Sequence, residues 1–288
     1  MPNIAGLTLM SAVRHPNTMA TAKTTTSTHT ITPKDLVEGF LRAANPEPLT
    51  IKSLLTVGET LGFSANAIRV AISRLCAKEQ VISDSRSCYR LTDKTLAINS
   101  FTDRWRLGES RVRPWQAHWI CCHLPQGMGR TERNQAQKAL SWYGLKLGLS
   151  GLYIRPDNLN LSIQELNSQL IDVALTPNAS LFRAYDFQEH QTQQWQRLWD
   201  IKAIETRYKS HYEKIAKSAN NFFEKPIEQS LSESLILGGD TLRVLTLDPL
   251  LPAEMIDITL RKKLSDMMEE YEAQCRKLWT EVIARLEE

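Results

Sequence analysis

Apolar side chains recur at helical spacing in the first third of the chain and predict three short helices in succession. The first begins at Pro33, after Thr32, because threonine favours the N-cap position and proline the first helical position. The second begins after Thr50 and ends near Gly62. The third covers Ala65–Lys78, so a short turn that contains glycine joins the second helix to the third.

Two short apolar runs follow the third helix and predict a β-hairpin. They are Val81–Ile82 and Cys88–Leu91, on either side of the polar turn Ser83–Ser87. Three helices followed by a small hairpin is the order of elements in a winged helix. We therefore predict a winged helix-turn-helix domain over residues 31–99, within a multidomain chain of the α+β class.

Strand and helix signals alternate in the next part of the chain. In order, they predict a strand over Pro114–Leu124, a helix from Thr131 to Leu145, a strand over Gly151–Arg155, a helix opened by the capping box Ser162–Glu165, and a strand over Leu181–Phe187. This alternation predicts a ferredoxin-like middle domain over residues 114–187, with a fourth strand assumed.

The remainder, residues 188–288, is predicted to be a helical domain that binds an effector and dimerises. We expect one long helix through Trp195–Ile215, an irregular stretch with Gly238–Gly239 and Asp248–Pro249, and a last helix at about Thr259–Leu286. Apolar side chains from Leu264 to Val282 alternate four- and three-residue spacing, a pattern that packs helix on helix. The partner of this seam is either a second chain or the helix Trp195–Ile215 of the same chain.

Composition narrows the class of protein. The chain has 288 residues, enough for two or three domains, and its net charge of +3 is too small by itself to indicate nucleic acid. Its apolar runs fall far short of the ~20 residues that span a bilayer. The five cysteines lack CxxC spacing, which fits a reducing compartment. We expect a cytoplasmic, nucleoid-associated protein with a disordered tail over residues 1–30 and a polar linker over residues 100–113.

The helix Ala65–Lys78 carries the strongest functional signal, because a polar stripe opposes its apolar stripe. Asn66 and Arg69 lie in its N-terminal half, and these residue types pair with adenine and guanine in the major groove. Arg74 and Lys78 lie farther along, where phosphates are within reach. The predicted DNA-binding residues of helix and hairpin are Ser64, Asn66, Arg69, Ser73, Arg74, Lys78, Arg86 and Arg90. A merely solvated surface helix is the alternative, and the hairpin directly after it favours DNA binding.

A possible zinc site and one arginine carry weaker signals. His118, Cys121, Cys122 and His123 have zinc-binding side chains, but alternate residues of a strand face opposite ways. No single metal could collect all four, so we predict no metal site. Arg155 either clamps a phosphate or carboxylate of a ligand or forms a structural ion pair. We find no catalytic constellation and predict neither enzymatic activity nor a cofactor.

Several motifs together resemble the PaaX family of repressors, which are GntR-like regulators of phenylacetic acid catabolism. The matching motifs are Leu61–Leu75 and Tyr89–Thr92 in the winged helix, Trp142–Gly144 and Gly151–Asp157 in a middle domain similar in fold to Cas2, and Leu198–Ile201, Tyr208 and Asp248–Pro252 in the C-terminal part. The resemblance covers about Thr32–Val282. The shared order of these motifs makes it persuasive.

The resemblance implies a homodimer that binds a palindromic operator and is released by an aromatic acyl-CoA such as phenylacetyl-CoA. We therefore expect a repressor of an aromatic-acid catabolic operon, with Arg155 as a candidate contact to the effector. One rival is a metal-dependent nuclease built on the Cas2-like domain, but its first strand, Trp115–Leu124, has no carboxylate to hold Mg²⁺. Another rival is an adaptor whose winged helix binds protein.

Overall fold

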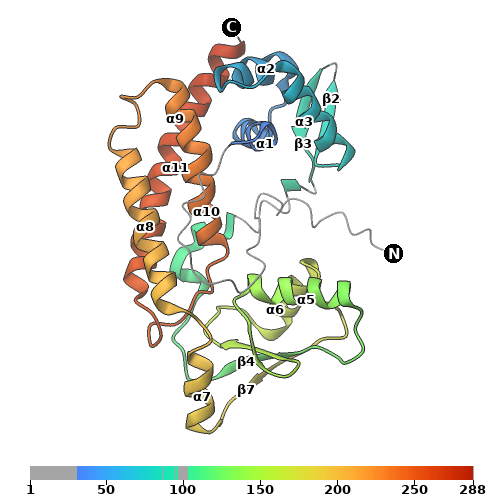
Figure 1. Ribbon diagram of the computed structural model, residues 1–288, viewed down its shortest axis with the longest axis vertical. Helices are drawn as coiled ribbons and strands as arrows, with labels where there is room; N and C mark the ends of the chain where they lie inside the picture. The colour runs from blue at the N-terminus through green and yellow to red at the C-terminus, as the bar shows by residue number, and fades with distance from the viewer. Residues whose placement is uncertain (1–30, 86, 94, 97–102, 288) are drawn as a thin grey trace. The chain divides into compact units, whose positions relative to one another are not determined.

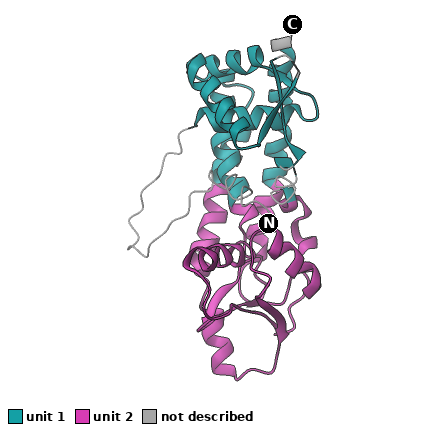
Figure 2. Ribbon diagram, turned by 90° about the vertical axis from the view of Figure 1, so that its right-hand side faces the viewer, with its two compact units in different colours: residues 1–103, 213–243, 267–288 teal, residues 104–212, 244–266 magenta. Residues whose placement is uncertain are grey.

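The computed structural model describes residues 31–85, 87–93, 95–96 and 103–287. The predicted tail and Arg86 lie outside these residues. The chain divides into two compact units (Figure 2): unit 1 takes in Met1–Asp103, Glu213–Arg243 and Met267–Glu288, and unit 2 takes in Arg104–Tyr212 and Val244–Asp266. The division into three domains stays a prediction.

Unit 1 opens with three helices and a three-stranded sheet. These elements are α1 (Pro33–Ala44), β1 (Leu49–Thr50), α2 (Ile51–Thr60), α3 (Ala65–Ala77), β2 (Val81–Ser85) and β3 (Cys88–Leu91). The strands are antiparallel in the order β1-β3-β2. The predicted helices and hairpin are confirmed, except that β2 continues through Ser83–Ser85, which were predicted to lie in the turn but pair with β3. Strand β1 is a further two-residue strand that was not predicted.

Side-chain caps fix where these helices begin. Thr32 accepts a hydrogen bond from the amide of Asp35, whose carboxylate accepts from the amide of Thr32, so the pair forms a capping box. Thr50 accepts from the amide of Ser53 at 3.1 Å and Ser64 from that of Ala67 at 3.2 Å. The predicted caps of the first two helices are confirmed.

The rest of unit 1 is helical. It is built from parts of α8 (Ile201–Ala219) and α11 (Ile258–Glu287), together with α9 (Ile227–Glu233), the π-helical turn η3 (Ser234–Gly238) and most of α10 (Gly239–Thr246). The predicted irregular stretch is therefore wrong at Gly238–Gly239, but it is confirmed at Asp248–Pro249, which lies between α10 and α11. Neither glycine adopts a positive φ, and both lie within the continuous helical run of α9, η3 and α10, so neither ends a helix.

The apolar seam of α11 is buried within one chain. Leu264 and Tyr271 are 0% exposed, and Met268, Leu278 and Val282 are also buried. Tyr271 packs edge-on against Phe222, 5.4 Å between ring centroids, and its hydroxyl lies 3.1 Å from Oγ of Ser218 at the end of α8. Of the two alternatives, packing within the chain is the one that the structure supports.

Unit 2 contains a four-stranded antiparallel sheet with helices on both faces (Figure 1). Its elements are the 3₁₀ segment η2 (Arg104–Arg111), β4 (Trp119–His123), α5 (Arg130–Trp142), β5 (Lys146–Leu149), β6 (Leu152–Pro156), α6 (Ile163–Asp172), β7 (Ser180–Ala184) and α7 (Glu189–Gln196). The strand order is β5-β6-β4-β7. Tyr153 accepts from Gln137 of α5 on one face, and Trp119 packs on Trp195 of α7 on the other.

Three predicted boundaries in unit 2 are corrected. The first strand starts at Trp119, not Pro114, because Ala117 has φ +59° and Trp115 Nε1 donates to the His118 carbonyl at 2.6 Å. The helix ends at Trp142, and Lys146–Leu149 supplies the fourth strand that was assumed. The single long helix through Trp195–Ile215 is two helices, because the Asp200 carboxylate caps α8 by accepting from the Ala203 amide at 2.9 Å.

The segment over residues 104–111, predicted to lie within a polar linker, carries a fully buried tryptophan, Trp105. None of the helices in the described parts of the chain combines the length and apolar character needed to cross a membrane. The burial of Trp105 and the character of the helices are the same however the chain is divided into domains.

Gly144 lies close to the backbone of Pro249 within unit 2. Gly144 has φ +74°, and a Cβ there would lie 2.9 Å from Cα of Pro249. Gly127 has φ +81° but open space around it. Gly127→Ala should lower the free energy of unfolding by about 1–2 kcal/mol for the left-handed backbone, and Gly144→Ala by about 1–3 kcal/mol more for the overlap. Denaturant titration measures both, and equal losses would show that the Pro249 contact can relax.

Candidate nucleic-acid interface

Helix α3 is held rigidly by its apolar side. Ile68, Ala71, Ile72 and Leu75 are all buried, which confirms the predicted stripe. A Cβ on Gly58 of α2 would lie only 2.6 Å from Cγ1 of Ile68, so the two helices meet where α2 has no side chain. This packing fixes which side of α3 remains in solvent.

The exposed side of α3 carries the residues predicted to bind DNA. Ser64, Asn66, Arg69, Ser73, Arg74 and Lys78 are all exposed. Arg69, Arg74 and Lys78 form no ion pair or side-chain hydrogen bond with any described residue. Asn66 lies in the first turn, where the helix dipole adds positive potential. The result is a row of hydrogen-bond donors and unneutralised charges along one accessible face.

The hairpin adds one described cation. Arg90 Nε donates to Asp84 Oδ1 at 2.9 Å, and the two side chains retain 35% and 42% exposure. An ion pair this exposed contributes only about 0–1 kcal/mol, so a phosphate could displace the carboxylate at small cost. Arg86, at the predicted tip of the hairpin, lies outside the described residues.

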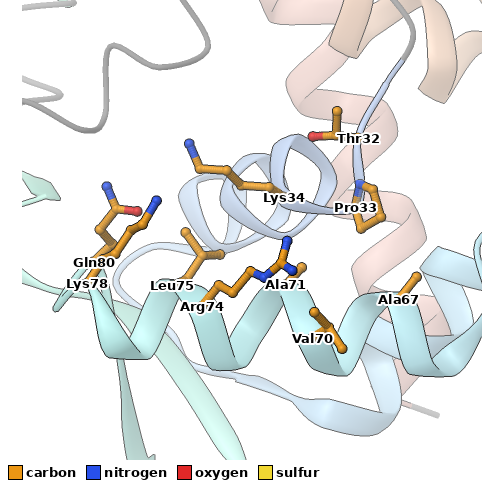
Figure 3. Close-up of a pocket in the computed structure, with 10 residues that line it drawn as sticks. All are labelled: Thr32, Pro33, Lys34, Ala67, Val70, Ala71, Arg74, Leu75, Lys78 and Gln80. Carbon is orange, nitrogen blue, oxygen red and sulfur yellow. The ribbon is translucent and has the colours of Figure 1, made fainter.

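A groove runs beside this face, between the first turn of α1 and the side of α3 (Figure 3). Its cavity volume is about 280 Å³, and Lys34, Arg74, Lys78 and Gln80 provide its polar lining together with Thr32. Val70, 39% exposed, also lines the groove. Sequence reasoning missed Lys34 and Gln80, because only the packing of α1 on α3 brings these two residues to the same place.

Arg155, the predicted effector contact, is 1% exposed. Its guanidinium donates to the carbonyl oxygens of Tyr143 and Pro156 and to Oδ1 of Asn158, all within unit 2. Burial lowers the pKa of Arg155, although nearby Asp157 and Asp248 oppose this shift. Three of its five N–H donors are thus used within the chain, which favours a structural role, although through neutral acceptors and not through the ion pair that was predicted. An effector contact at Arg155 stays a prediction.

Two of the residues considered as zinc ligands, Cys121 and Cys122, lie in β4. Cys121 and Cys122 are buried, and burial raises their pKa values to about 11 and about 12, so both thiols remain protonated at neutral pH. Among the described residues, no three His, Cys, Asp or Glu side chains form a group that could hold a metal ion.

One segment of the chain matches a known protein family. Residues 39–95 match the family model described as "PaaX-like protein", from within α1 to beyond the hairpin. A solved structure, the uncharacterized protein Rv0674 from Mycobacterium tuberculosis, has a TM-score of 0.60 and 22% identity over 86% of this chain and 99% of its own. At that identity the likeness concerns the fold alone. No curated protein matches the chain.

The structural interpretation of Arg155 predicts a loss of stability. Arg155→Met keeps an apolar stem but leaves three acceptors without their donor, each worth about 1–3 kcal/mol when buried. We expect the free energy of unfolding to fall by about 3 kcal/mol or more, while Arg69→Met, at an exposed site, changes it by less than about 0.5 kcal/mol. Urea titration of both variants measures this. Unchanged stability in Arg155→Met would return Arg155 to the candidates for ligand binding.

Proposed function

The chain is a PaaX-family protein by its match over residues 39–95, and from this premise we propose that it is a sequence-specific DNA-binding transcriptional repressor. The family indicates transcriptional regulation, not catalysis. One observation carries this proposal: the exposed face of α3 holds Asn66 and Arg69 beside cations that have no ion-pair partner among the described residues.

In this proposal residues 31–99 form a winged helix-turn-helix, with α2 and α3 as the helix pair and β2–β3 as the wing. The element order α1-β1-α2-α3-β2-β3 supports it. Helix α3 enters the major groove, where Asn66 and Arg69 reach base edges, with Ser64 and Ser73 beside them. Arg74 and Lys78 contact phosphates, and Arg86 and Arg90 follow adjacent backbone or the minor groove.

The middle domain, residues 114–187, is proposed to be ferredoxin-like and similar in fold to Cas2. Its strand-helix-strand-strand-helix-strand order and its sheet order β5-β6-β4-β7 support this. A nuclease there would need free carboxylates for Mg²⁺. Asp157, just after β6, accepts instead from Arg113 at 2.9 Å and Arg183 at 2.7 Å. The observations therefore favour regulation over the nuclease.

The effector and the oligomeric state complete the proposal. We infer an aromatic acyl-CoA as the releasing signal and a homodimer as the DNA-binding form, both on the strength of the family resemblance. The buried seam of α11 does not supply the dimer interface, since its side chains are already covered within the chain. Residues 188–288 are proposed as the effector and dimerisation domain.

The DNA-binding proposal predicts different effects for a residue that contacts bases and for one that contacts phosphates. The full chain is first used to enrich bound duplexes from a random DNA pool. Arg69→Ala should then cost about 1–3 kcal/mol on the enriched duplex and relax the preference at one base pair. Lys78→Ala should weaken binding to enriched and scrambled duplexes alike. Fluorescence anisotropy measures both, and equal, unselective losses would mean that the reading face is misassigned.

The effector proposal predicts that phenylacetyl-CoA lowers affinity for the enriched duplex, whereas phenylacetate and free CoA do not. A ligand shifts the equilibrium only if it prefers the conformation that does not bind DNA. Titration of the three compounds against the labelled duplex in a mobility-shift assay separates them. If no aromatic acyl-CoA moves the equilibrium, the effector is wrong, while the DNA-binding proposal is judged by the preceding experiment.

A further inference from the structure

The groove beside α3 has the charge of an anion site. Lys34, Arg74 and Lys78 line it, and its lining contains no carboxylate. Lys34 lies 3.5 Å from Glu38, one turn along α1, and this single contact leaves other ammonium protons free. Arg74 and Lys78 have no ion pair with the described part of the chain. Three cations from two helices therefore converge on one concavity (Figure 3).

Gln80 supplies a second observation that points to a ligand. It is 4% exposed and lines the groove, yet its side-chain Oε1 has no hydrogen-bond partner among the described residues. Its backbone is fixed: the amide donates to Leu75, and the carbonyl accepts from the amide of Thr92 and the hydroxyl of Thr95. Buried polar groups normally have a partner. Because Oε1 and a phosphate oxygen both only accept, this amide can meet a phosphate only through its donor Nε2, with the amide turned about its last side-chain bond.

We propose that this groove seats a phosphate of the DNA backbone, so that α1 belongs to the DNA interface together with α3. The inference rests on the proposed DNA-binding function and adds Lys34 and Gln80 to it. Arg74 and Lys78 belong both to the groove and to the exposed face of α3, so the groove continues the proposed reading surface. The exposed Val70 in its lining suits the carbon face of a sugar beside that phosphate.

The balance of charge favours a polyanion over a small amphipathic acid. A monocarboxylate and one phosphodiester each carry a single negative charge, but a strand brings further phosphates past the groove, and these can neutralise the remaining cations. The N-terminus of α1 lines the same groove through Thr32, but the carboxylate of Asp35 in the capping box already offsets its helix dipole. The side chains, and not the helix end, therefore carry the site.

The test is the salt dependence of DNA affinity in the full chain. Each phosphate contact contributes about 0.9 to the slope of log K against log salt. Lys34→Ala should therefore lower the slope by about 1 and weaken binding about fivefold at 0.15 M salt, equally on enriched and scrambled duplexes. Lys34→Arg should keep the wild-type slope. Lys146→Ala, which removes the same charge from an exposed position in unit 2, serves as the matched control.

Gln80→Leu provides an uncharged second arm, expected to lower affinity without changing the slope. Thermal melting of each variant checks that the fold is retained. A wild-type slope in Lys34→Ala overturns the proposal and leaves the groove to a small anion. If the Arg69→Ala effects on base preference hold at the same time, only the groove proposal fails. If the wild-type chain shows no salt-dependent affinity for any duplex, the DNA-binding function itself fails.

Discussion

Buried charge is the constraint on which unit 2 depends. Arg155, Asp157, Asp248 and Arg261 are between 1% and 6% exposed. Ions at such depth are costly unless each is met by a partner and its remaining donors or acceptors are satisfied. Asp248 accepts from the Tyr208 hydroxyl and from the Leu250 amide, both at 2.6 Å, and burial together with this carboxylate raises the pKa of Tyr208. The hydroxyl consequently remains a donor across the physiological pH range.

The hydrogen-bond partners of these buried charges come from segments far apart in the sequence, so the hydrogen bonds tie those segments together. Asn158 donates to the Leu250 carbonyl at 2.7 Å, Arg261 donates to the Leu251 carbonyl at 3.0 Å, and Glu109 holds Arg261 through two hydrogen bonds of 2.8 Å. Removing one partner would leave another charge buried and unpaired, so the contacts form and break together. The segment Asp248–Pro252, one of the motifs that resemble the PaaX family, is thus a meeting point of this network.

The sequence predicted most of what depends on local chemistry. The caps at Thr32 and Thr50 and the buried stripe of α3 are properties of short windows, so they could be read directly. The strands β1 and β5 could not be predicted in this way. They have two and four residues, too few to show an alternating apolar pattern, and most of β5 is exposed. The break at Asp200 was missed because a polar residue is ordinary within an amphipathic helix. The groove required tertiary packing, since Lys34 and Gln80 are distant in sequence.

Several arginines of unit 2 are paired with carboxylates, whereas the cations on α3 are not, and this contrast supports α3 as the proposed interface. In unit 2, Arg113, Arg183 and Arg261 each bind a carboxylate, so their charge is satisfied within the protein. On α3, Arg69 and Lys78 carry charge that no described carboxylate neutralises, at positions where solvent and a ligand can reach them. Holding like charges together is unfavourable for folding alone. The proposed DNA interface accounts for their presence on a helix fixed by tight packing, and under that proposal the orientation of α3 decides which base edges Asn66 and Arg69 meet.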